Sequence, residues 1–260
     1  DDDLSRRVFE RKRRAWRGQD LTIVTPSRWL ADAARSSSLL RDANVSVISN
    51  GVDLARFRPA DRDGARRRIG LETDRFVLLF SAVEGLGDRN KGYALLQEAL
   101  DRLAGQGMAD RLLLLVAGLD APQNPPPSAV PLRFAGRLSE EGLALHLAAA
   151  EALARPSRQE NQPKLVIEAM ACGRPAVAFR ATGLPELIAD RETGYLAEPY
   201  RTEDFAAGIA WLAEAPDRVQ ELGRRARTRA EQEHGVDGMA RRYMELYRAA
   251  ANSGLRGRLP

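Results

Sequence analysis

The most informative stretch of this 260-residue sequence reads Glu160-Asn161-Gln162-Pro163-Lys164-Leu165-Val166-Ile167-Glu168, and Ala169-Met170-Ala171-Cys172-Gly173 follows directly. Pro163 suits the first position of a helix, where its missing N–H costs nothing. Gly173, with Pro175 shortly after it, marks the end of that helix. We therefore expect Glu160 just before the helix and Glu168 about one and a half turns inside it.

This arrangement brings two kinds of binding group to one place. The free backbone N–H groups of the first helical turn, near Lys164 and Leu165, carry a partial positive charge that attracts phosphate. They are expected to point toward the same space as Glu160, whose carboxylate accepts hydrogen bonds from hydroxyls. A ligand that contains both a sugar and a phosphate would use both groups.

The rest of the chain alternates apolar segments with amphipathic helical segments. Residues 76–81 form a continuous apolar run, as expected of a strand that is buried on both faces of a sheet. The alternation predicts an α/β fold, a Rossmann-like parallel sheet with helices on both faces. Ligands of such folds bind at the carboxyl ends of the strands. Lys91, Arg137, Glu160 and Thr182-Gly183 all follow predicted strands and are expected at that one edge.

Composition and punctuation divide the chain into four segments. Residues 1–53 contain a predicted N-terminal helix and two short strands, and residues 54–72 are expected to be a polar, proline-marked linker. The Rossmann-like domain is expected over 73–236, with a helical region at 202–233. A C-terminal helix and tail occupy 237–260.

The E-x7-E stretch resembles a motif of the retaining family 4 glycosyltransferases, which have the GT-B fold. Further segments similar to this family occur in matching order, from about residue 20 to about residue 250. They are Thr25–Leu30, Ile48–Asp53 with Phe57–Pro59, Asn90–Gly92, Arg155–Ser157, Thr182–Glu186 and Thr193–Tyr195. No single segment identifies the family, but the ordered set is specific. The resemblance implies that 73–236 is the donor-binding, C-terminal domain of such an enzyme, and that 1–53 is the tail of its acceptor-side domain.

The resemblance also implies roles for three residues. Lys91, together with the helix amides, would bind the diphosphate of a nucleotide-sugar, and Glu168 would accept hydrogen bonds from the ribose hydroxyls. Glu160 would lie beside the donor sugar, so Glu160 and Lys91 are the catalytic candidates. Each residue also has a competing interpretation without a function. Lys91 could be an exposed lysine, Glu168 a surface glutamate on a helix, and Glu160 a solvated loop residue.

Three further donor-site candidates are less distinctive. Members of this family commonly carry an arginine several residues before the lysine; residues 82–87 contain none, and Arg89 is the candidate substitute. The resemblance implies that Arg137 lies beside the nucleotide base and that Gly183 lies on the loop that approaches the donor. Arg137 is equally interpretable as a surface arginine, and Gly183 as a residue that supplies a turn conformation.

We expect neither a cofactor nor a metal. In this family, transfer is usually viewed as same-face attack assisted by the leaving phosphate, with Lys91 and the helix amides stabilising the developing charge. His146 and His234 are far apart in sequence and are expected to be structural or exposed. Cys172 is the single cysteine; it fits a small packed residue and indicates a reducing cytosol.

The formal net charge of +4 is modest, but basic residues cluster near the start of the chain. They are Arg6, Arg7, Arg11, Lys12, Arg13, Arg14 and Arg17. One interpretation is a solvated helix face, and another is a patch for anionic lipid headgroups, which would suit a membrane-bound acceptor. Nucleic acid is not expected as a partner, because no binding motif and no aromatic interleaving accompanies the cluster.

The sequence therefore predicts the donor-binding half of a cytoplasmic, retaining glycosyltransferase, with peripheral contact at the inner face of the plasma membrane as an option. Its expected partners are a nucleotide-sugar donor, a hydroxyl acceptor (a glycan, a lipid-linked acceptor or a small molecule) and an N-terminal Rossmann-like acceptor domain, fused or separate. The alternatives are a non-catalytic nucleotide-sugar-binding module and a nucleotide-sugar epimerase or phosphorylase of related fold.

Overall fold

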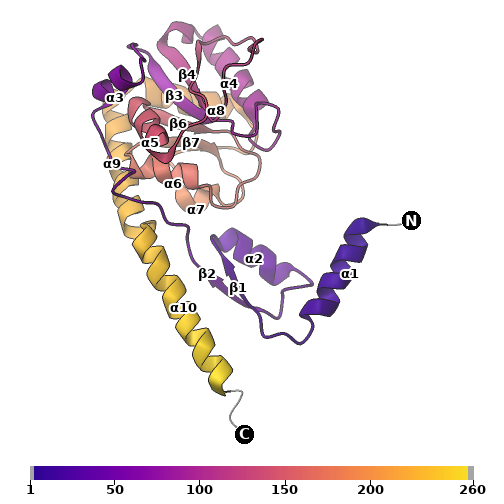
Figure 1. Ribbon diagram of the computed structural model, residues 1–260. Coiled ribbons are helices and arrows are strands. Elements are labelled where there is room, and N and C mark those ends of the chain that lie inside the picture. The colour runs from indigo at the N-terminus through magenta and orange to yellow at the C-terminus, as the bar shows by residue number, and fades with distance from the viewer. Residues whose placement is uncertain (1–2, 257–260) are drawn as a thin grey trace.

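A computed structural model describes residues 3–256 of the chain and shows two parts (Figure 1). The smaller part consists of helix α1 (Leu4–Trp16), strand β1 (Thr22–Thr25), helix α2 (Arg28–Ser36) and strand β2 (Asn44–Val47). Strands β1 and β2 pair in parallel as a two-stranded sheet. Ser27 caps α2 by accepting a hydrogen bond from the backbone N–H of Leu30, as its sequence position predicts.

The larger part is a domain of alternating strands and helices. In chain order it contains α3 (Arg62–Arg68), β3 (Phe76–Ser81), α4 (Tyr93–Gly105), the 3-10 helix η1 (Ala109–Arg111), β4 (Leu112–Ala117), β5 (Leu132–Phe134), α5 (Glu140–Ala149), β6 (Ala152–Arg155), α6 (Lys164–Ala171), β7 (Ala176–Phe179), α7 (Leu184–Leu187), β8 (Gly194–Ala197), α8 (Thr202–Ala213), α9 (Pro216–Glu233) and α10 (Val236–Arg256). Figure 1 shows α10 continuing from α9 away from the large sheet.

The six strands of this domain form one sheet in the order β5-β4-β3-β6-β7-β8, and every neighbouring pair is parallel. The chain starts in the middle of the sheet with β3, builds outward to β5, and then returns to place β6 on the other side of β3. This is the strand order of dinucleotide-binding Rossmann folds. The expected α/β fold with a Rossmann-like parallel sheet is therefore confirmed.

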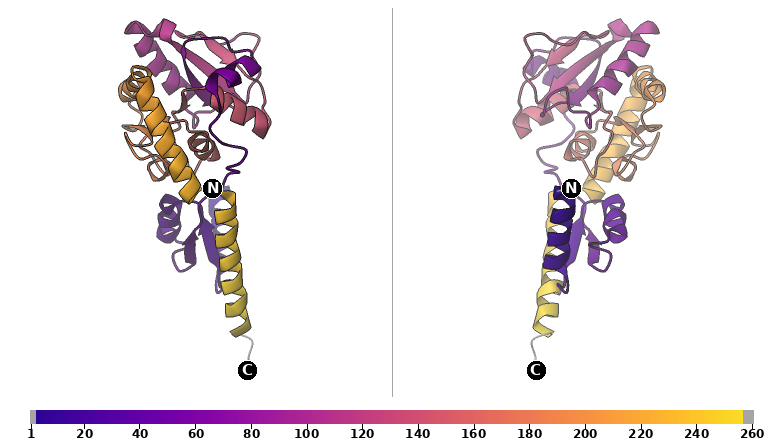
Figure 2. Two further views of the ribbon diagram at one scale, coloured as in Figure 1. Left: turned by 90° about the vertical axis from the view of Figure 1, so that its left-hand side faces the viewer. Right: turned by 90° about the vertical axis from the view of Figure 1, so that its right-hand side faces the viewer.

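Strand β3 is a continuous apolar run because helices cover its side chains on both faces of the sheet. Successive side chains of a strand point to opposite faces. Leu78 and Phe80 pack into a cluster with helices α4 and α8, whereas Val77 and Leu79 pack with α5 and α6 on the other face. Helix α9 packs against α6 on that second face and also reaches the first cluster through its N-terminal half. Helices thus cover both faces of the sheet, as Figure 2 shows from two sides.

Three local expectations need correction. The expected linker over residues 54–72 is not a free connection, because it contains α3, whose Ala65 and Arg66 are buried against the domain. The helical region expected at 202–233 is two helices, because the residue before Pro216 is disfavoured in a helix and Ala215 adopts an extended conformation. Pro163 is the residue before α6 and not its first helical residue.

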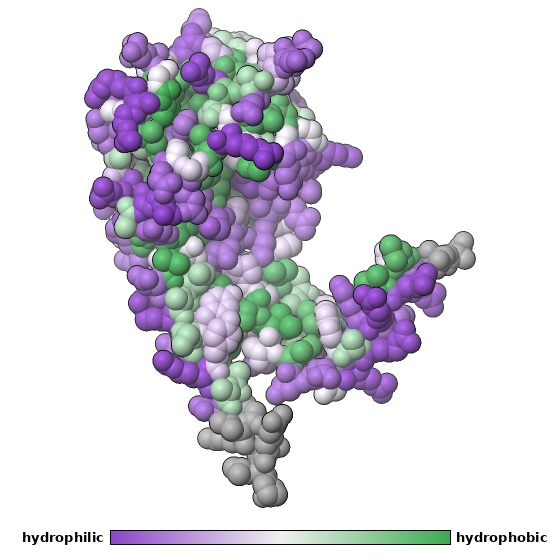
Figure 3. Space-filling model, viewed as in Figure 1, coloured by the Kyte–Doolittle hydropathy of each residue, from purple (hydrophilic) through white to green (hydrophobic). Residues whose placement is uncertain are grey.

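The surface of the smaller part differs from that of the domain. In Figure 3 hydrophobic residues reach the surface over the β1–β2 unit and on one side of α1. Leu4 of α1 is 71% exposed, and Trp16 and Val47 are also exposed. Among residues 3–256, no helix combines the length and apolar character needed to cross a membrane.

Candidate functional site

The candidate site lies where the strand order of the sheet reverses. β3 and β6 are neighbours, but the chain leaves them in opposite directions along the sheet, so their following loops diverge and leave a crevice at the carboxyl edge. The loop after β3 carries Lys91 and the loop after β6 carries Glu160. The topology therefore brings together two residues that are 69 positions apart in the sequence.

Glu160 is the centre of a compact charged cluster. Its Oε1 accepts a hydrogen bond from Lys91 Nζ at 3.1 Å, and Arg155 Nη2 also donates to it. The side chains of Glu160 and Arg155 are 12% and 6% exposed, whereas that of Lys91 is 31% exposed. Two cations on one carboxylate leave the cluster with a net positive charge that faces solvent through Lys91.

Backbone contacts hold the two loops against each other. Gly92 has φ +73°, and a Cβ at this position would overlap the carbonyl oxygen of Pro156. The backbone N–H of Arg158 donates to the carbonyl oxygen of Asn90 at 2.8 Å. A glycine after Lys91 is therefore required for the close approach of the loops, and this approach places the lysine at Glu160.

Glu168 lies in the second turn of α6, in different surroundings from Glu160. It is 7% exposed, and among the described residues the one cation within ion-pair distance is Lys164, whose Nζ lies 4.0 Å from Oε1, one turn earlier in the same helix. Burial raises the pKa of the Glu168 carboxyl, and the Lys164 ammonium lowers it less. The burial of α6 expected from its sequence is confirmed, and it leaves this carboxylate with unused hydrogen-bonding capacity.

The start of α6 has open backbone donors. No side chain caps this eight-residue helix, so the N–H groups of Lys164 and Leu165 have no capping partner. The Lys164 side chain is largely exposed, whereas Leu165 packs partly against the core beneath the sheet.

The loop after β7 packs directly on the loop that carries Glu160. Thr182 Oγ1 donates to the carbonyl oxygen of Glu160 at 2.6 Å and accepts from its N–H at 3.0 Å. Gly183 also donates from its N–H to that carbonyl oxygen. Gly183 lies in the turn before α7, but its φ is −84°, and Thr182 carries the left-handed conformation of this turn. Gly183 is needed because a Cβ would overlap the carbonyl oxygen of Asn161.

Two of the sequence candidates stand apart from this cluster. Arg89 and Arg137 are exposed, and neither forms a hydrogen bond or an ion pair within residues 3–256. Arg137 follows Gly136 after β5, as expected, and its guanidinium is free to meet a ligand. Their roles at the donor stay predictions.

Arg155 is a site residue that sequence reasoning did not select. It stands at the end of β6, and its Nε is buried without a hydrogen-bond partner among the described residues. Ser157 Oγ, two residues later, is also buried and unpaired. Both belong to the Arg155–Ser157 segment, so the signal was present. The sequence alone does not show that the fold places the Arg155 side chain against Glu160.

A polar network joins the site to the smaller part of the chain. Ser27 Oγ donates to Asn161 Oδ1, and the N–H of Asn50 donates to Gln162 Oε1 at 2.6 Å. Gln162 Nε2 donates in turn to Ser49 Oγ at 3.0 Å. These residues continue the loop of Glu160, so the geometry of this loop depends on the β1–β2 unit.

Two further contacts complete this junction. The carboxylate of Glu186 accepts from the backbone N–H groups of Arg28 and Trp29 at 2.8 and 2.6 Å and so caps the start of α2. His234 is buried with its Nδ1 2.7 Å from Ser49 Oγ. Burial lowers the pKa of His234 to about 4, so its ring is neutral at pH 7.

Two other kinds of reactive group are a cluster of metal ligands and a free thiol. Among residues 3–256, no group of three or more His, Cys, Asp or Glu side chains is placed to hold a metal ion. Cys172 is buried at the end of α6, and burial raises the pKa of its thiol to about 12. The interpretation of Cys172 as a packed residue is confirmed.

Comparisons with known proteins agree with this fold. Residues 61–229 match the protein family described as "Glycosyl transferases group 1". The matched range covers the strands β3 to β8 and both candidate carboxylates. The chain belongs to this family of glycosyltransferases.

Individual relatives show how much of such a protein is present. The chain is 30% identical to a D-inositol 3-phosphate glycosyltransferase of Rhodococcus erythropolis, over 90% of this chain and 56% of that protein. It therefore spans about half the length of the curated relatives it matches.

Two solved structures share its fold. Sucrose-phosphate synthase from Thermosynechococcus elongatus matches with a TM-score of 0.80 and 24% identity, over 96% of this chain and 62% of that one. The C-terminal domain of a group 1 glycosyltransferase from Francisella tularensis matches with a TM-score of 0.57 and 17% identity, over 72% of this chain and 100% of that one. The resemblance to the C-terminal half of a GT-B enzyme is confirmed.

Proposed function

We propose that this chain is the donor-binding half of a retaining glycosyltransferase, which binds a nucleotide-diphosphate sugar and passes the sugar to a hydroxyl acceptor. The observation that carries the proposal is the pair of carboxylates at the reversal point of the sheet. Glu160 is held by two cations, and Glu168 is buried with unused acceptor capacity. Membership in the group 1 family supports the same assignment.

The diphosphate would be held by protein cations and amides. Lys91 is partly exposed, and among residues 3–256 its ammonium bonds only to Glu160, so it can turn to a phosphate while Arg155 keeps Glu160 in place. The uncapped N–H groups of Lys164 and Leu165 add donors that face an anion favourably. We propose that these groups carry the charge of the diphosphate without a metal. Arg89 and Arg137 are free to contact the phosphate and the base.

The two carboxylates would recognise the two sugars of the donor. A carboxylate accepts well from vicinal hydroxyls, and Glu168 is desolvated, which strengthens such bonds. We assign it to the ribose. Glu160 keeps hydrogen-bonding capacity beyond its two cations, and we assign it to the hydroxyls of the transferred sugar.

The reaction would proceed on one face of the sugar. The bond from the anomeric carbon to the diphosphate oxygen breaks, and a bond to the acceptor oxygen forms on the same face. The acceptor proton passes to the departing phosphate oxygen. Lys91 and the α6 amides would stabilise the charge that grows on the diphosphate, which is the larger part of such catalysis. The anomeric configuration would be retained.

The acceptor would be bound by a second Rossmann-like half. The β1–β2 unit is a parallel sheet of only two strands, whereas parallel sheets normally extend further and are covered on both faces. Further strands beside β1 or β2 would supply the acceptor wall. Closure of the two halves would bring the acceptor hydroxyl to the donor.

The chain by itself would then act as a nucleotide-sugar-binding module, which is the second candidate function. The donor groups are present, but no acceptor wall accompanies them in residues 3–256. An epimerase or phosphorylase would need a partner half as well, and the family match does not favour either.

A membrane contact through α1 is part of the proposal. Arg6, Arg13 and Arg14 belong to a face of α1 rich in basic residues, while Leu4 and Trp16 are exposed apolar residues. Such a helix suits the surface of an anionic bilayer. Sedimentation with vesicles that contain anionic lipid, against neutral vesicles, tests it, and equal binding to both would contradict it.

Two experiments test the main proposal. Calorimetric titration with UDP, GDP and ADP, each with and without an attached sugar and without added metal, should show binding of at least one. The chain should transfer no sugar alone over a panel of hydroxyl acceptors, and addition of the missing half should restore transfer with retention. Robust turnover by the isolated chain would place the acceptor site within these residues and refute the half-enzyme.

A further inference from the structure

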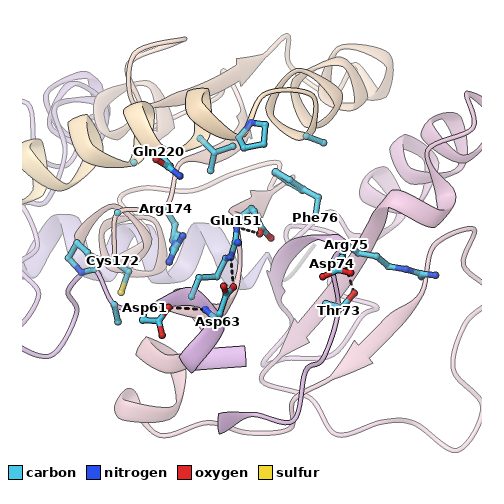
Figure 4. A pocket seen from close by; sticks show the side chains of 18 of the residues that line it. Asp61, Asp63, Thr73, Asp74, Arg75, Phe76, Glu151, Cys172, Arg174 and Gln220 are labelled. Carbon is cyan, nitrogen blue, oxygen red and sulfur yellow. Dashed lines mark hydrogen bonds and ion pairs between the residues drawn. The ribbon is translucent and has the colours of Figure 1, made fainter. Parts of the chain in front are cut away.

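A cavity lies at the edge of the sheet opposite the candidate donor site. It has a volume of about 1130 Å³ and is lined by residues from α9, from the segment before α3 and from the starts of β3 and β6 (Figure 4). Phe76 is the first residue of β3, Glu151 directly precedes β6, and Arg174 lies just before β7. Because all strands are parallel, these residues lie at the amino edge, whereas Lys91 and Glu160 follow the carboxyl ends. The cavity is therefore separate from the donor site.

One carboxylate at this edge is fully occupied. Arg66 Nη2 donates to both oxygens of Glu151 at 2.8 and 2.7 Å, and Arg62 Nη1 donates at 2.9 Å. The backbone N–H of Val77 adds a third donor at 2.7 Å. Glu151 and Arg66 are buried, so this cluster is stable without any ligand. Glu151 is therefore poorly able to neutralise the charge of a further cation nearby.

Arg174 is that further cation. Its Nη2 donates to the carbonyl oxygen of Ala148 at 2.7 Å, but its Nε is buried and has no hydrogen-bond partner among residues 3–256. Burial lowers the pKa of Arg174; Glu151 opposes this, and repulsion from Arg62 and Arg66 adds to it. A half-buried guanidinium with an unused donor is costly unless an anion compensates its charge.

The rest of the wall decides what kind of anion fits. Phe76, Pro59, Pro216 and Val219 make part of the lining apolar. Four aspartates also line the cavity, and all but one of them pair with an arginine: Asp61, Asp63, Asp74 and Asp110, of which Asp74 has no such partner among the described residues. Arg174 forms no ion pair within residues 3–256, so it is the cation that these carboxylates leave uncompensated. In Figure 4 the side chain of Gln220 points into the cavity from α9, across from Arg174, and Gln220 makes no hydrogen bond within the described residues. The cavity thus places a cation without an ionic partner beside apolar side chains, which suits an organic anion better than an inorganic one.

We propose that this cavity binds a small organic anion, a phosphate ester or a carboxylate with an apolar portion, through Arg174 and Arg62. The anion accepts from the guanidinium of Arg174, which lines the cavity, and the apolar portion lies against Phe76 and Val219. The position of Arg174 connects the cavity to the donor site, because residues 172–174 directly follow α6, whose first turn and Glu168 belong to that site. The binding itself does not depend on the proposed transferase function.

Titration of the whole chain with matched aromatic probes tests the proposal. Phenyl phosphate and benzoate share the ring and separate the phosphate source from the carboxylate source, and inorganic phosphate lacks the apolar part. Binding is followed at constant ionic strength through the Nε–H resonance of Arg174 and by calorimetry. We expect at least one aromatic anion to bind tenfold more tightly than inorganic phosphate and to shift that resonance.

Variants identify the site. Arg174→Gln should weaken the bound probe at least tenfold, whereas Arg41→Gln, an exposed arginine elsewhere, should have no effect. Lys91→Ala should also leave this binding unchanged, which excludes binding at the donor site. Gln220→Glu places a negative charge across from Arg174 at an exposed position, so it should weaken binding even if Arg174→Gln does not fold.

Two results would overturn the proposal. The first is the absence of binding by both aromatic anions up to millimolar concentration. The second is binding that Gln220→Glu and Arg174→Gln leave unchanged, or that Lys91→Ala removes.

Discussion

At both edges of the six-stranded sheet a glutamate is held by two cationic side chains. At the amino edge, Glu151 is bound by Arg66 from a packed helix and by Arg62, and a backbone amide saturates it. At the carboxyl edge, Glu160 is bound by Arg155 and by Lys91, which sits on a loop and is partly exposed.

The difference lies in what surrounds each pair. The Glu151 cluster attaches α3 to the sheet, and both oxygens of the Glu151 carboxylate have hydrogen-bond donors. The Glu160 cluster is assembled by turns and lies beside unused groups, including Arg155 Nε and Ser157 Oγ. The same ion-pair chemistry is structural where its members are buried and saturated. It is available for a ligand where one member can exchange its partner.

The largest expected effect comes from breaking the amino-edge pair. Arg66→Met leaves Glu151 buried without its principal partner and should lower the free energy of unfolding by about 3–5 kcal/mol. Urea unfolding followed by circular dichroism measures it. Arg102→Met removes an exposed pair with Glu98 and Glu203 and should cost less than about 1 kcal/mol. Equal costs for the two variants would remove the distinction between the clusters.

The next effect concerns pH and the junction beside the carboxyl edge. The pKa of His234 is lowered from 6.5 to about 4 in the folded chain, so between these values the unfolded chain binds more protons. Stability from this group is therefore full above about pH 6.5 and is lost as the pH falls toward 4, by about 3 kcal/mol in total. Urea unfolding at pH 7.5, 6, 5 and 4 measures the slope. His234→Gln should flatten it, and an unchanged slope in that variant would rule out the assignment.

The carboxyl-edge pair should affect binding and not stability. Lys91→Ala should weaken binding of a nucleoside diphosphate by about 1.5–3 kcal/mol, the range for hydrogen bonds to charged groups. Its free energy of unfolding should change by less than about 1 kcal/mol, because Lys91 is partly exposed and Arg155 still compensates Glu160. Calorimetry and urea unfolding measure the two quantities, with Lys12→Ala as the exposed lysine control. Undiminished affinity would refute the phosphate role.

The smallest expected effect separates the two donor carboxylates. Glu168→Ala should weaken the free nucleotide and the nucleotide-sugar alike, by about 1 kcal/mol, because both contain ribose. Glu160→Ala should weaken chiefly the nucleotide-sugar. Parallel titrations of both variants with both ligands give the difference, and the reverse pattern would exchange the two roles.

The comparison also marks what the sequence could predict. β3 and α6 were predictable because their signals are local: an unbroken apolar run, and a proline and a glycine around a buried helix. The positions of Lys91 and Glu160 after strands placed them at one edge, since parallel strands end together. Their 3.1 Å contact also needed β3 and β6 to be neighbours, which the strand order decides.

The ion pair at the amino edge could not be predicted from the sequence, because it also depends on long-range contacts. Glu151 follows α5 and Arg66 lies in a segment that reads as a polar linker, so neither carries a local sign of burial. Their burial is tolerable because they pair with each other and with further hydrogen-bond partners, and this pairing spans 85 positions. Thr182 is a similar case: a threonine gives no warning of a left-handed conformation, which its two bonds to Glu160 stabilise.

The two-stranded sheet of β1 and β2 has a practical consequence for this half of the protein. Within the described residues, each of its strands pairs on one side only, so each presents a row of backbone donors and acceptors on the other. Unpaired edges of this kind recruit strands from neighbouring molecules. In concentrated solution the isolated chain should therefore self-associate, and a chain that supplies the adjoining strand should keep it monomeric.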